Sequence, residues 1–225
     1  DVELPGRAEV AAILSYQQQM AERHGVVMEL GQRVDATTVL DGQPDAVVLA
    51  TGATLRRPPG LSPDTDPVTA ADFFVSNHTN QHSAGCALFF DMDHGASAYG
   101  VVDLMVQYFD HVILVTPRTQ IAQNVNYCSA IGIHRRLHHA QVEIVTAHDL
   151  VDYRENTVTC RNVFTGEDRR FEEIDDVIYV TPRIVIDTLE PLLTARVDVD
   201  RVGDCQSPRN LMAAIHSGHL VGLSL

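Results

Sequence analysis

The chain has 225 residues, with 16 basic and 30 acidic side chains and a formal net charge of −14. This acidity makes nucleic acid and anionic membrane surfaces poor partners. No uncharged apolar stretch approaches the roughly 20 residues of a membrane span, and no signal-peptide pattern is present. The four cysteines stand far apart in the sequence, so we expect no disulfide framework and a protein that resides in the reducing cytoplasm.

The first part of the chain predicts alternating helices and strands. Pro5 at a first turn, Gly25 as a stop and apolar side chains at near-helical spacing between them predict a helix, followed by a strand over residues 26–30. The continuous apolar run Val47-Val48-Leu49 is typical of a parallel sheet that is covered on both faces. This predicted strand ends in Ala-Thr-Gly at Thr51-Gly52.

The middle of the chain predicts a strand–helix–strand unit. Residues 55–84 are rich in Pro and Gly and indicate a linker with a short helix near residues 70–75. After it, we expect a strand over residues 85–90, a crossover helix over 96–109 and a strand over 111–115.

The following residues predict a smaller set of elements before the chain returns. We expect a broken helix over residues 119–141 and a strand over 142–145. An antiparallel hairpin should follow, with strands at 156–163 and 169–171 joined by residues 165–168, and then a return strand at 177–180. The last helix carries Ala214, Gly218 and Gly222 at four-residue spacing, which predicts close packing on a sheet.

The turn after the strand at 85–90 contains Asp91 and Asp93 where a cofactor-binding turn is usually rich in glycine. These carboxylates would repel a pyrophosphate unless a cation intervenes, so we do not expect NAD in its usual pose. After the next strand, Arg118 would suit either the 2′-phosphate of NADPH or no ligand at all. We favour the second alternative, in which this part of the fold only packs and binds no NADPH. A catalytic or Mg²⁺ cluster of Asp91, Asp93 and His94 is the weakest of the alternatives.

The stretch Val202-Gly203-Asp204-Cys205 carries the strongest functional signal. Glycine lets a backbone approach a ligand closely, and a carboxylate can accept hydrogen bonds from sugar hydroxyls. A helix-like run begins at Arg209, and its first N–H groups and positive dipole end would favour a phosphate. Cys205 has no partner cysteine nearby and is expected to be inert.

These motifs occur in an order that resembles one known protein family. In flavoproteins with two dinucleotide-binding domains, an Ala-Thr-Gly strand end marks the exit from the first domain and Gly-Asp marks the return. The chain resembles the C-terminal region of the trimethylamine dehydrogenase and 2,4-dienoyl-CoA reductase family, which includes histamine dehydrogenase. The resemblance rests on Pro5-Gly6-Arg7, Ala50-Thr51-Gly52, Val115-Thr116-Pro117-Arg118, Gly203-Asp204-Cys205, Pro208 to Leu211, Ala214-Ile215 and Gly218.

The resemblance implies an α/β fold of two intertwined Rossmann-like domains with mostly parallel sheets, the first of them incomplete. Residues 1–54 and 194–225 would form a partial FAD- or ADP-binding domain, and residues 85–190 an inserted NAD(P)-binding-like domain, with 55–84 as a linker. The two domain loops would converge at one sheet edge, where Thr51, Gly52, Gly203 and Asp204 would orient the cofactor.

Family members also carry a barrel with FMN and an iron–sulfur cluster, followed by a Gly-rich turn. The sequence has no G-x-G-x-x-G and no pair of cysteines close enough to begin a cluster site. The resemblance therefore implies that FMN and the cluster belong to a missing segment or a partner subunit, within an oligomer. Histidines such as His134 and His138 stand at a spacing that zinc can use, but no third ligand is predicted, so we expect no metal site.

Two functional hypotheses remain beside the weak Asp91-Asp93-His94 alternative. The first is the dinucleotide-domain part or subunit of a flavin-dependent oxidoreductase, which contributes to an FAD, ADP or NAD(P)H site and to electron transfer. The resemblance implies amine dehydrogenase, demethylase or enoyl reductase chemistry. The second is a non-catalytic structural module of a larger oxidoreductase that has lost nucleotide binding.

Overall fold

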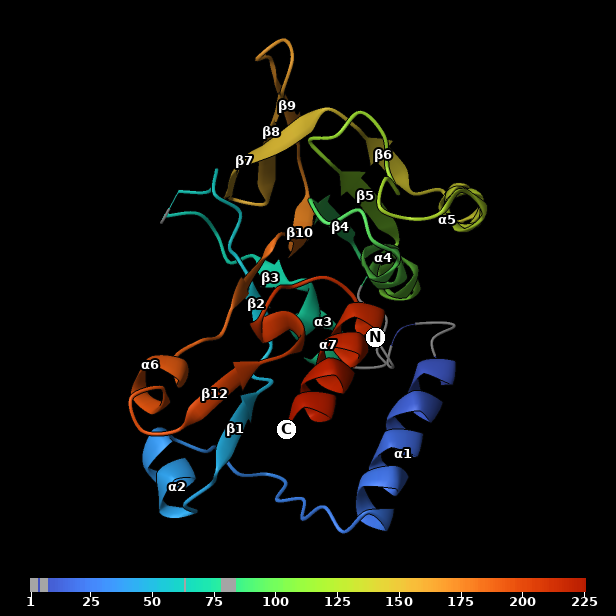
Figure 1. The fold of residues 1–225 in the computed structure, drawn as a ribbon. Coiled ribbons are helices and arrows are strands. Elements are labelled where there is room, and N and C mark those ends of the chain that lie inside the picture. The colour runs from blue at the N-terminus through green and yellow to red at the C-terminus, as the bar shows by residue number, and fades with distance from the viewer. Residues whose placement is uncertain (1–3, 5–7, 63, 78–83) are drawn as a thin grey trace. The chain divides into compact units, whose positions relative to one another are not determined.

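A computed structural model describes residues 4, 8–62, 64–77 and 84–225 of the chain (Figure 1). The chain forms two compact units whose segments alternate along the sequence. The larger unit contains residues 1–24 and 57–182, and the smaller contains residues 25–56 and 183–225. The predicted α/β class with intertwined units and mostly parallel sheets is confirmed.

The compact units divide the chain at different residues from the predicted domains. Residues 1–24 belong to the larger unit, and residues 183–193 belong to the smaller one. The predicted linker contains regular structure within its described part, including a strand at Thr69–Ala70 and a helix at Ala71–Asn77. The predicted helix start at Pro5 lies outside the described residues. The assignment of either unit to a particular cofactor stays a prediction.

A five-stranded sheet forms the centre of the larger unit. Its neighbouring strands are parallel throughout. The central strand has four consecutive side chains with no exposed surface, Ala87 to Phe90, as its apolar run predicts for a strand covered on both faces. The strand order is β3 (Thr69–Ala70), β10 (Ile174–Val180), β4 (Cys86–Asp91), β5 (His111–Val115), β6 (Glu143–Val145).

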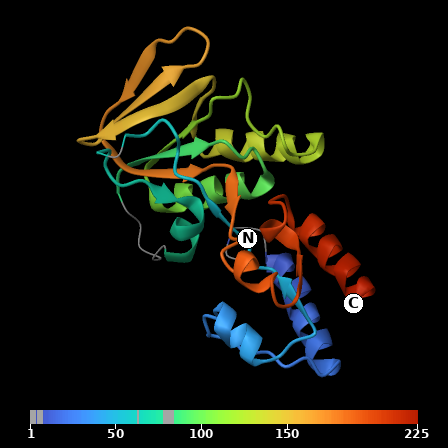
Figure 2. The ribbon, with the colours of Figure 1, turned by 60° about the vertical axis from the view of Figure 1, so that its left-hand side comes forward.

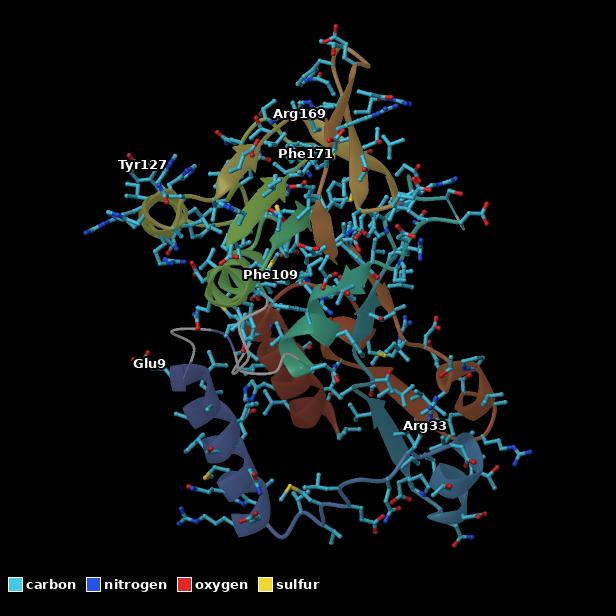
Figure 3. The ribbon with its side chains drawn as sticks, turned by 180° about the vertical axis from the view of Figure 1, so that it is seen from behind. Glu9, Arg33, Phe109, Tyr127, Arg169 and Phe171 are labelled. Carbon is cyan, nitrogen blue, oxygen red and sulfur yellow. The ribbon has the colours of Figure 1, made fainter. Side chains whose placement is uncertain are left out.

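Helices connect the strands of this sheet. Helix α4 (Ala96–Tyr108) packs against β5 and against α5 (Tyr127–His139), and the two green helices lie side by side in Figure 2. The side chain of Asn126 caps α5 by accepting the amide of Ser129 at 3.0 Å. Tyr127 projects from the start of α5 and is 79% exposed (Figure 3). The remaining helices of the larger unit include α1 (Ala8–Arg23) and α3 (Ala71–Asn77).

A three-stranded antiparallel sheet follows β6 where only a two-stranded hairpin was predicted. It consists of β7 (His148–Arg154), β8 (Thr157–Asn162) and β9 (Asp168–Phe171). Strand β7 was missed because it is largely polar, and its turn to β8 places Glu155 and Asn156 at positive φ without a glycine. On β9, the guanidinium of Arg169 lies 4.6 Å from the ring centre of Phe171 (Figure 3).

The smaller unit is built on a two-stranded parallel sheet. Its core contains Leu49, Leu193 and Cys205, which are at most 5% exposed. Strand β2 (Ala53–Leu55) pairs with β11 (Arg183–Val185) in a separate antiparallel sheet. In chain order the elements are α2 (Ala36–Asp41), β1 (Ala46–Leu49), β2 (Ala53–Leu55), β11 (Arg183–Val185), α6 (Glu190–Leu193), β12 (Asp198–Arg201), a 3₁₀ turn (Gly203–Cys205) and α7 (Leu211–Ser224).

Two predictions for the smaller unit are wrong. Residues 26–30 do not form a strand, and Val27 and Leu30 are at least 80% exposed, because no described strand pairs with them. The glycines at 218 and 222 in α7 face open space, so the predicted packing of the small-residue stripe is absent there. Across the described part of the chain, no helix combines the length and apolar character that crossing a bilayer requires.

Candidate functional site

The carboxyl ends of β1 and β12 lie side by side in the smaller unit (Figure 1). The strands are parallel, with Leu49 paired to Arg201 at their ends. The amide of Val202 donates to the carbonyl oxygen of Leu49 at 3.0 Å. The loops after the two strands therefore leave the sheet at one edge. The prediction that Thr51-Gly52 and Gly203-Asp204 converge at this edge is confirmed.

Thr51 joins the first loop to the rest of the unit. Its hydroxyl donates to the carbonyl oxygen of Ile186, and its Oγ1 lies 3.1 Å from Sγ of Cys205. The amide of Ile186 donates to the carbonyl oxygen of Gly52 at 3.0 Å. The single hydroxyl proton of Thr51 is therefore committed to the protein itself. Thr51 positions the loop, and it has no proton left to donate to a ligand.

Gly52 adopts a backbone conformation that side chains disfavour. Its φ is +76°, in the left-handed region. Apart from Gly52 and its two chain neighbours, no atom of the described residues lies within 4 Å of the position that a Cβ would occupy. The glycine is thus required by the turn and not by crowding, and it leaves open space over the backbone into which a ligand can approach.

Gly203 has a different role from Gly52. Its φ is +65°, and a Cβ at this residue would lie 3.4 Å from the Cβ of Ala214 on α7. Its amide donates to the hydroxyl of Ser217 at 2.8 Å. Gly203 therefore allows the turn to pack closely on the helix, a contact that the sequence could not reveal because the two partners lie further along the chain.

Asp204 follows in this turn and is half-buried. Its Oδ1 accepts the amide of Arg209 at 3.2 Å, which orients the carboxylate. Among the described residues, Oδ2 has no hydrogen-bond partner. One oxygen thus fixes the side chain and the other remains an acceptor, which is the arrangement that recognition of a ligand hydroxyl needs.

Helix α7 starts two residues later than predicted, at Leu211. The side chain of Asn210 caps it by accepting the amide of Ala213 at 2.9 Å. The amides of Leu211 and Met212 have no partner within the helix, as at any helix start. The N-terminus of α7 therefore keeps a positive partial charge that can attract an anion, although the Asn210 cap reduces it.

Arg118, the fifth predicted site residue, belongs to the larger unit. It is exposed and follows β5, where its amide lies 3.3 Å from Oγ1 of Thr116 and its carbonyl oxygen accepts the amide of Ala147. The structure therefore groups the other four predicted residues in one unit and places Arg118 in the other.

The turn after β4 is held by its own carboxylates. Oδ1 of Asp91 accepts the amides of Asp93 and His94 at 3.0 and 2.9 Å. Oδ2 of Asp93 accepts the amide of Gly95 at 3.2 Å. Oδ2 of Asp91 accepts the hydroxyl of Tyr99 at 2.7 Å, and both of these side chains are fully buried. The sequence indicated the carboxylates but not the tyrosine that supports them.

His94 is buried in the same turn. Its ring is 1% exposed, its φ is +60°, and Nδ1 lies 3.4 Å from Oδ2 of Asp91. Neither ring nitrogen has a hydrogen-bond partner among the residues that the structure describes. Burial lowers the pKa of His94 despite the opposing charge of Asp91, and the charge of Arg118 acts in the same direction as burial.

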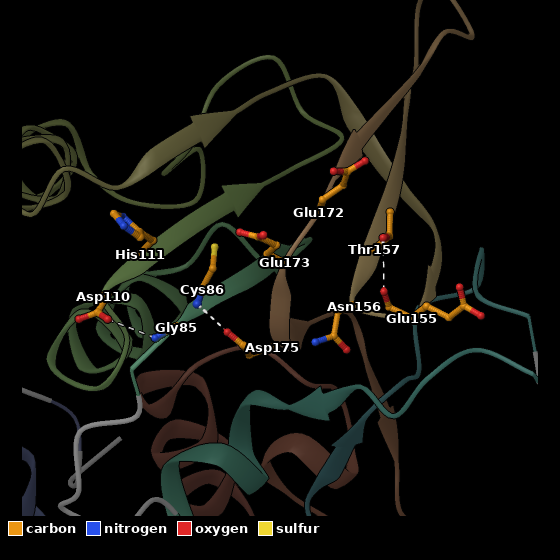
Figure 4. Close-up of a pocket in the computed structure, with 10 residues that line it drawn as sticks. All are labelled: Gly85, Cys86, Asp110, His111, Glu155, Asn156, Thr157, Glu172, Glu173 and Asp175. Atoms are coloured by element: carbon orange, nitrogen blue, oxygen red, sulfur yellow. Dashed lines mark hydrogen bonds between the residues drawn. The ribbon is translucent and has the colours of Figure 1, made fainter.

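A cavity of about 700 Å³ opens at the opposite, amino ends of the strands in the larger unit (Figure 4). Cys86, at the start of β4, donates its amide to the carboxylate of Asp175 at 2.9 Å. Burial raises the pKa of the Cys86 thiol, and Asp175 adds to the effect. Five carboxylates line this cavity and disfavour an anionic nucleotide: Asp110, Glu155, Glu172, Glu173 and Asp175.

The two histidines that stand at a zinc-compatible spacing lie on one helix. The rings of His134 and His138 stack at 6.4 Å on α5. Within the residues that the structure describes, no group of three or more His, Cys, Asp or Glu side chains is arranged to hold a metal ion.

No protein-family model matches the sequence, and no curated protein matches it. Solved structures do match its fold. Histamine dehydrogenase from Rhizobium sp. 4-9 is 24% identical with a TM-score of 0.84, over 99% of this chain and 37% of that one. An amine oxidase for 6-hydroxypseudooxynicotine from Pseudomonas geniculata N1 is 21% identical with a TM-score of 0.85, over 98% and 35%.

A 2-naphthoyl-CoA reductase, solved in complex with 2-naphthoyl-CoA, is 19% identical with a TM-score of 0.87. The alignment covers all of this chain and 33% of the reductase. The chain thus spans about a third of the length of each of these three proteins. At these identities the likeness establishes the fold.

Proposed function

We propose that the chain is the dinucleotide-domain part of a flavin-dependent oxidoreductase, and that its smaller unit forms one wall of an FAD or ADP site. The observation that carries this proposal is the meeting of Gly52 and Asp204 at the carboxyl edge of two neighbouring parallel strands. Ligands of α/β sheets bind at such edges. The enzymes with the same fold are named as a histamine dehydrogenase, an amine oxidase and a 2-naphthoyl-CoA reductase. These names support an oxidoreductase.

Each residue would have its own part in this site. Oδ2 of Asp204 would accept a hydrogen bond from a ribose or ribityl hydroxyl, and the first amides of α7 would face a phosphate. Gly52 would allow the ligand to approach the backbone, while Thr51 and Gly203 would hold the two loops in register. A bound flavin would supply the electron-accepting ring, and the chain would position it.

A further segment or a partner subunit would complete the site. The smaller unit has no Gly-rich phosphate turn, and α7 exposes large apolar side chains, with Met212 at 77% and Leu223 at 72%. A two-stranded sheet is also a marginal structure in water. These features support docking against a strand–turn–helix that carries the missing glycines, together with an FMN-bearing part of the enzyme.

A structural role is the second candidate. In the larger unit, the chain's own carboxylates occupy the amides of the turn after β4, which favours a domain that has lost a ligand there. On this alternative the whole chain would serve assembly of a larger oxidoreductase and would hold no nucleotide.

Acid extraction distinguishes the two candidates when it is applied to the protein purified together with the segment or subunit that would complete the site. The extract is compared by chromatography with FAD, ADP and NADPH standards. FAD or ADP in stoichiometric amount is the expected result, and an empty extract would favour the structural role.

A matched pair of variants tests the site itself. Asp204→Ala should release the nucleotide while circular dichroism shows an unchanged fold. Asp200→Ala removes the same charge from an exposed position on neighbouring β12 and should retain the nucleotide. Equal retention by both variants would refute the role given to Asp204.

A further inference from the structure

The turn after β4 occupies the place of a dinucleotide-binding turn in the larger unit. It follows the central parallel strand and precedes the crossover helix α4. β10 lies on one side of β4 and β5 on the other, so the strand order changes direction beside this turn, and ligands of open α/β sheets bind at such points. Asp91, Asp93 and Ala96 have the spacing of the small residues in G-x-G-x-x-G/A, with aspartates at the first two positions.

We propose that Asp91 and Asp93 close this turn to dinucleotides, because their carboxylates occupy the amides that a pyrophosphate would bind. Every amide from residue 93 to residue 95 already donates to one of the two carboxylates, at 2.9–3.2 Å. A pyrophosphate would have to displace these oxygens and then lie beside their charges.

The carboxylate of Asp91 cannot move aside readily. Its second oxygen accepts the hydroxyl of Tyr99, and the Tyr99 oxygen in turn accepts the amide of Ala122. Asp91 and Tyr99 have no exposed surface. Turning the carboxylate away would leave a buried charge and buried polar groups without partners, so this half of the closure is part of the core.

The small residues of the turn are covered as well. A Cβ at Gly95 would lie 2.6 Å from Oδ2 of Asp93, so this carboxylate rests directly on the glycine backbone. At Gly100 on α4, the side chain of Leu4 comes to 3.0 Å of the same position. At both glycines, the space through which a ligand could approach the backbone is therefore occupied by side chains of the protein itself.

The consequence is that the turn after β4 holds no dinucleotide, so a 2′-phosphate would not reach Arg118 by way of this turn. The charge of Arg118 acts on His94 within this turn. The inference concerns the larger unit alone and holds whether or not Asp204 binds a nucleotide.

Hydrogen exchange of the purified protein tests the closure. NADPH, NADH and inorganic pyrophosphate are each added at millimolar concentration, with EDTA or with Mg²⁺. Peptides covering residues 86–100 should show no ligand-dependent protection in either condition. Saturable protection of these peptides would overturn the proposal, and protection confined to residues 201–217 would report on the other unit.

The variant Asp93→Gly should gain affinity for pyrophosphate. It restores a glycine, frees the amide of Gly95 and leaves the buried Asp91–Tyr99 pair in place, so pyrophosphate should bind at least about tenfold more tightly than to the wild type. Asp93→Asn, which keeps the shape without the charge, serves if the glycine variant is unstable. Glu172→Gln removes an exposed charge from the same unit and should gain nothing. Failure of both Asp93 variants to gain affinity would also overturn the proposal.

Discussion

Oδ2 of Asp91 accepts the phenolic hydrogen of Tyr99 at 2.7 Å, and neither side chain is exposed to solvent. Burial, reinforced by the charge of Asp91, raises the pKa of the Tyr99 phenol far above its usual value. The hydroxyl therefore remains protonated at physiological pH and remains a donor. A buried carboxylate depends on such a donor, because its charge has lost the solvation of water.

Tyr99→Phe should lower the free energy of unfolding by about 2–4 kcal/mol, because it removes a donor from buried Asp91 and the acceptor of the Ala122 amide. Urea unfolding followed by circular dichroism measures this loss. Tyr127→Phe changes a tyrosine that is 79% exposed and should stay within about 0.5 kcal/mol of wild type. Equal effects of the two variants would contradict the importance of the Asp91–Tyr99 hydrogen bond.

His94 should make stability depend on pH. Burial lowers its pKa below the ordinary 6.5, with Asp91 and Asp93 opposing and Arg118 assisting. As pH falls below 6.5, the unfolded chain binds a proton that the folded chain still rejects. The contribution is therefore present above this pH and is lost on acidification, with a slope of at most about 1.4 kcal/mol per pH unit for one proton.

His94→Asn isolates this contribution, because asparagine tolerates the positive φ at this residue and does not titrate. Between pH 7 and about pH 5, its free energy of unfolding should fall less steeply than that of the wild type. His139→Asn, at an exposed position, should keep the wild-type slope. A parallel pH profile for wild type and His94→Asn would show that His94 does not titrate differently on folding.

The core of the smaller unit should depend on one of two adjacent leucines. Leu193 has no exposed surface and packs with Leu49 and Cys205, whereas Leu192 is 59% exposed. Leu193→Ala should cost about 2–4 kcal/mol through lost burial and a residual cavity, and Leu192→Ala should cost less than about 1 kcal/mol. Thermal unfolding of the two variants side by side measures the difference, and similar losses would contradict this assignment of the core.

The elements that the sequence predicted best are those decided by local pattern. The strand ending at Asp91, the helix from Ala96 and the strand from His111 have continuous apolar runs or helical spacing that suit a buried parallel unit. Strand β7 escaped prediction because its polar residues form a strand only when β8 pairs with them. The apolar residues at 26–30 failed as a strand for the converse reason, since no described strand pairs with them.

The candidate site shows the same division. The family resemblance carried by Ala-Thr-Gly and Gly-Asp implied that the two loops meet, and the pairing of β1 with β12 brings them to one sheet edge. The individual roles were not predictable, because the partners lie far along the chain: Ile186 accepts the Thr51 hydroxyl, and Ser217 accepts the Gly203 amide. The support of Asp91 by Tyr99 likewise depends on a helix facing the end of its strand.

Two glycines in the smaller unit should respond to alanine with opposite signs. Both Gly52 and Gly218 have open space where a Cβ would be placed, so neither substitution creates a clash. Gly52 has a φ of +76°, where alanine is strained, and Gly52→Ala should lower the free energy of unfolding by about 1–2 kcal/mol. Gly218 lies within α7, and Gly218→Ala should raise it by up to about 1 kcal/mol through helix propensity.

Urea unfolding of the two variants measures both signs in one experiment. The same preparations also test the ligand side of Gly52, because a methyl group there would fill the space proposed for the nucleotide. Gly52→Ala should therefore retain less nucleotide on acid extraction, whereas Gly218→Ala should retain the wild-type amount. Unchanged stability of Gly52→Ala would contradict the positive φ, and full nucleotide retention in a folded Gly52→Ala protein would contradict close approach of the ligand at this loop.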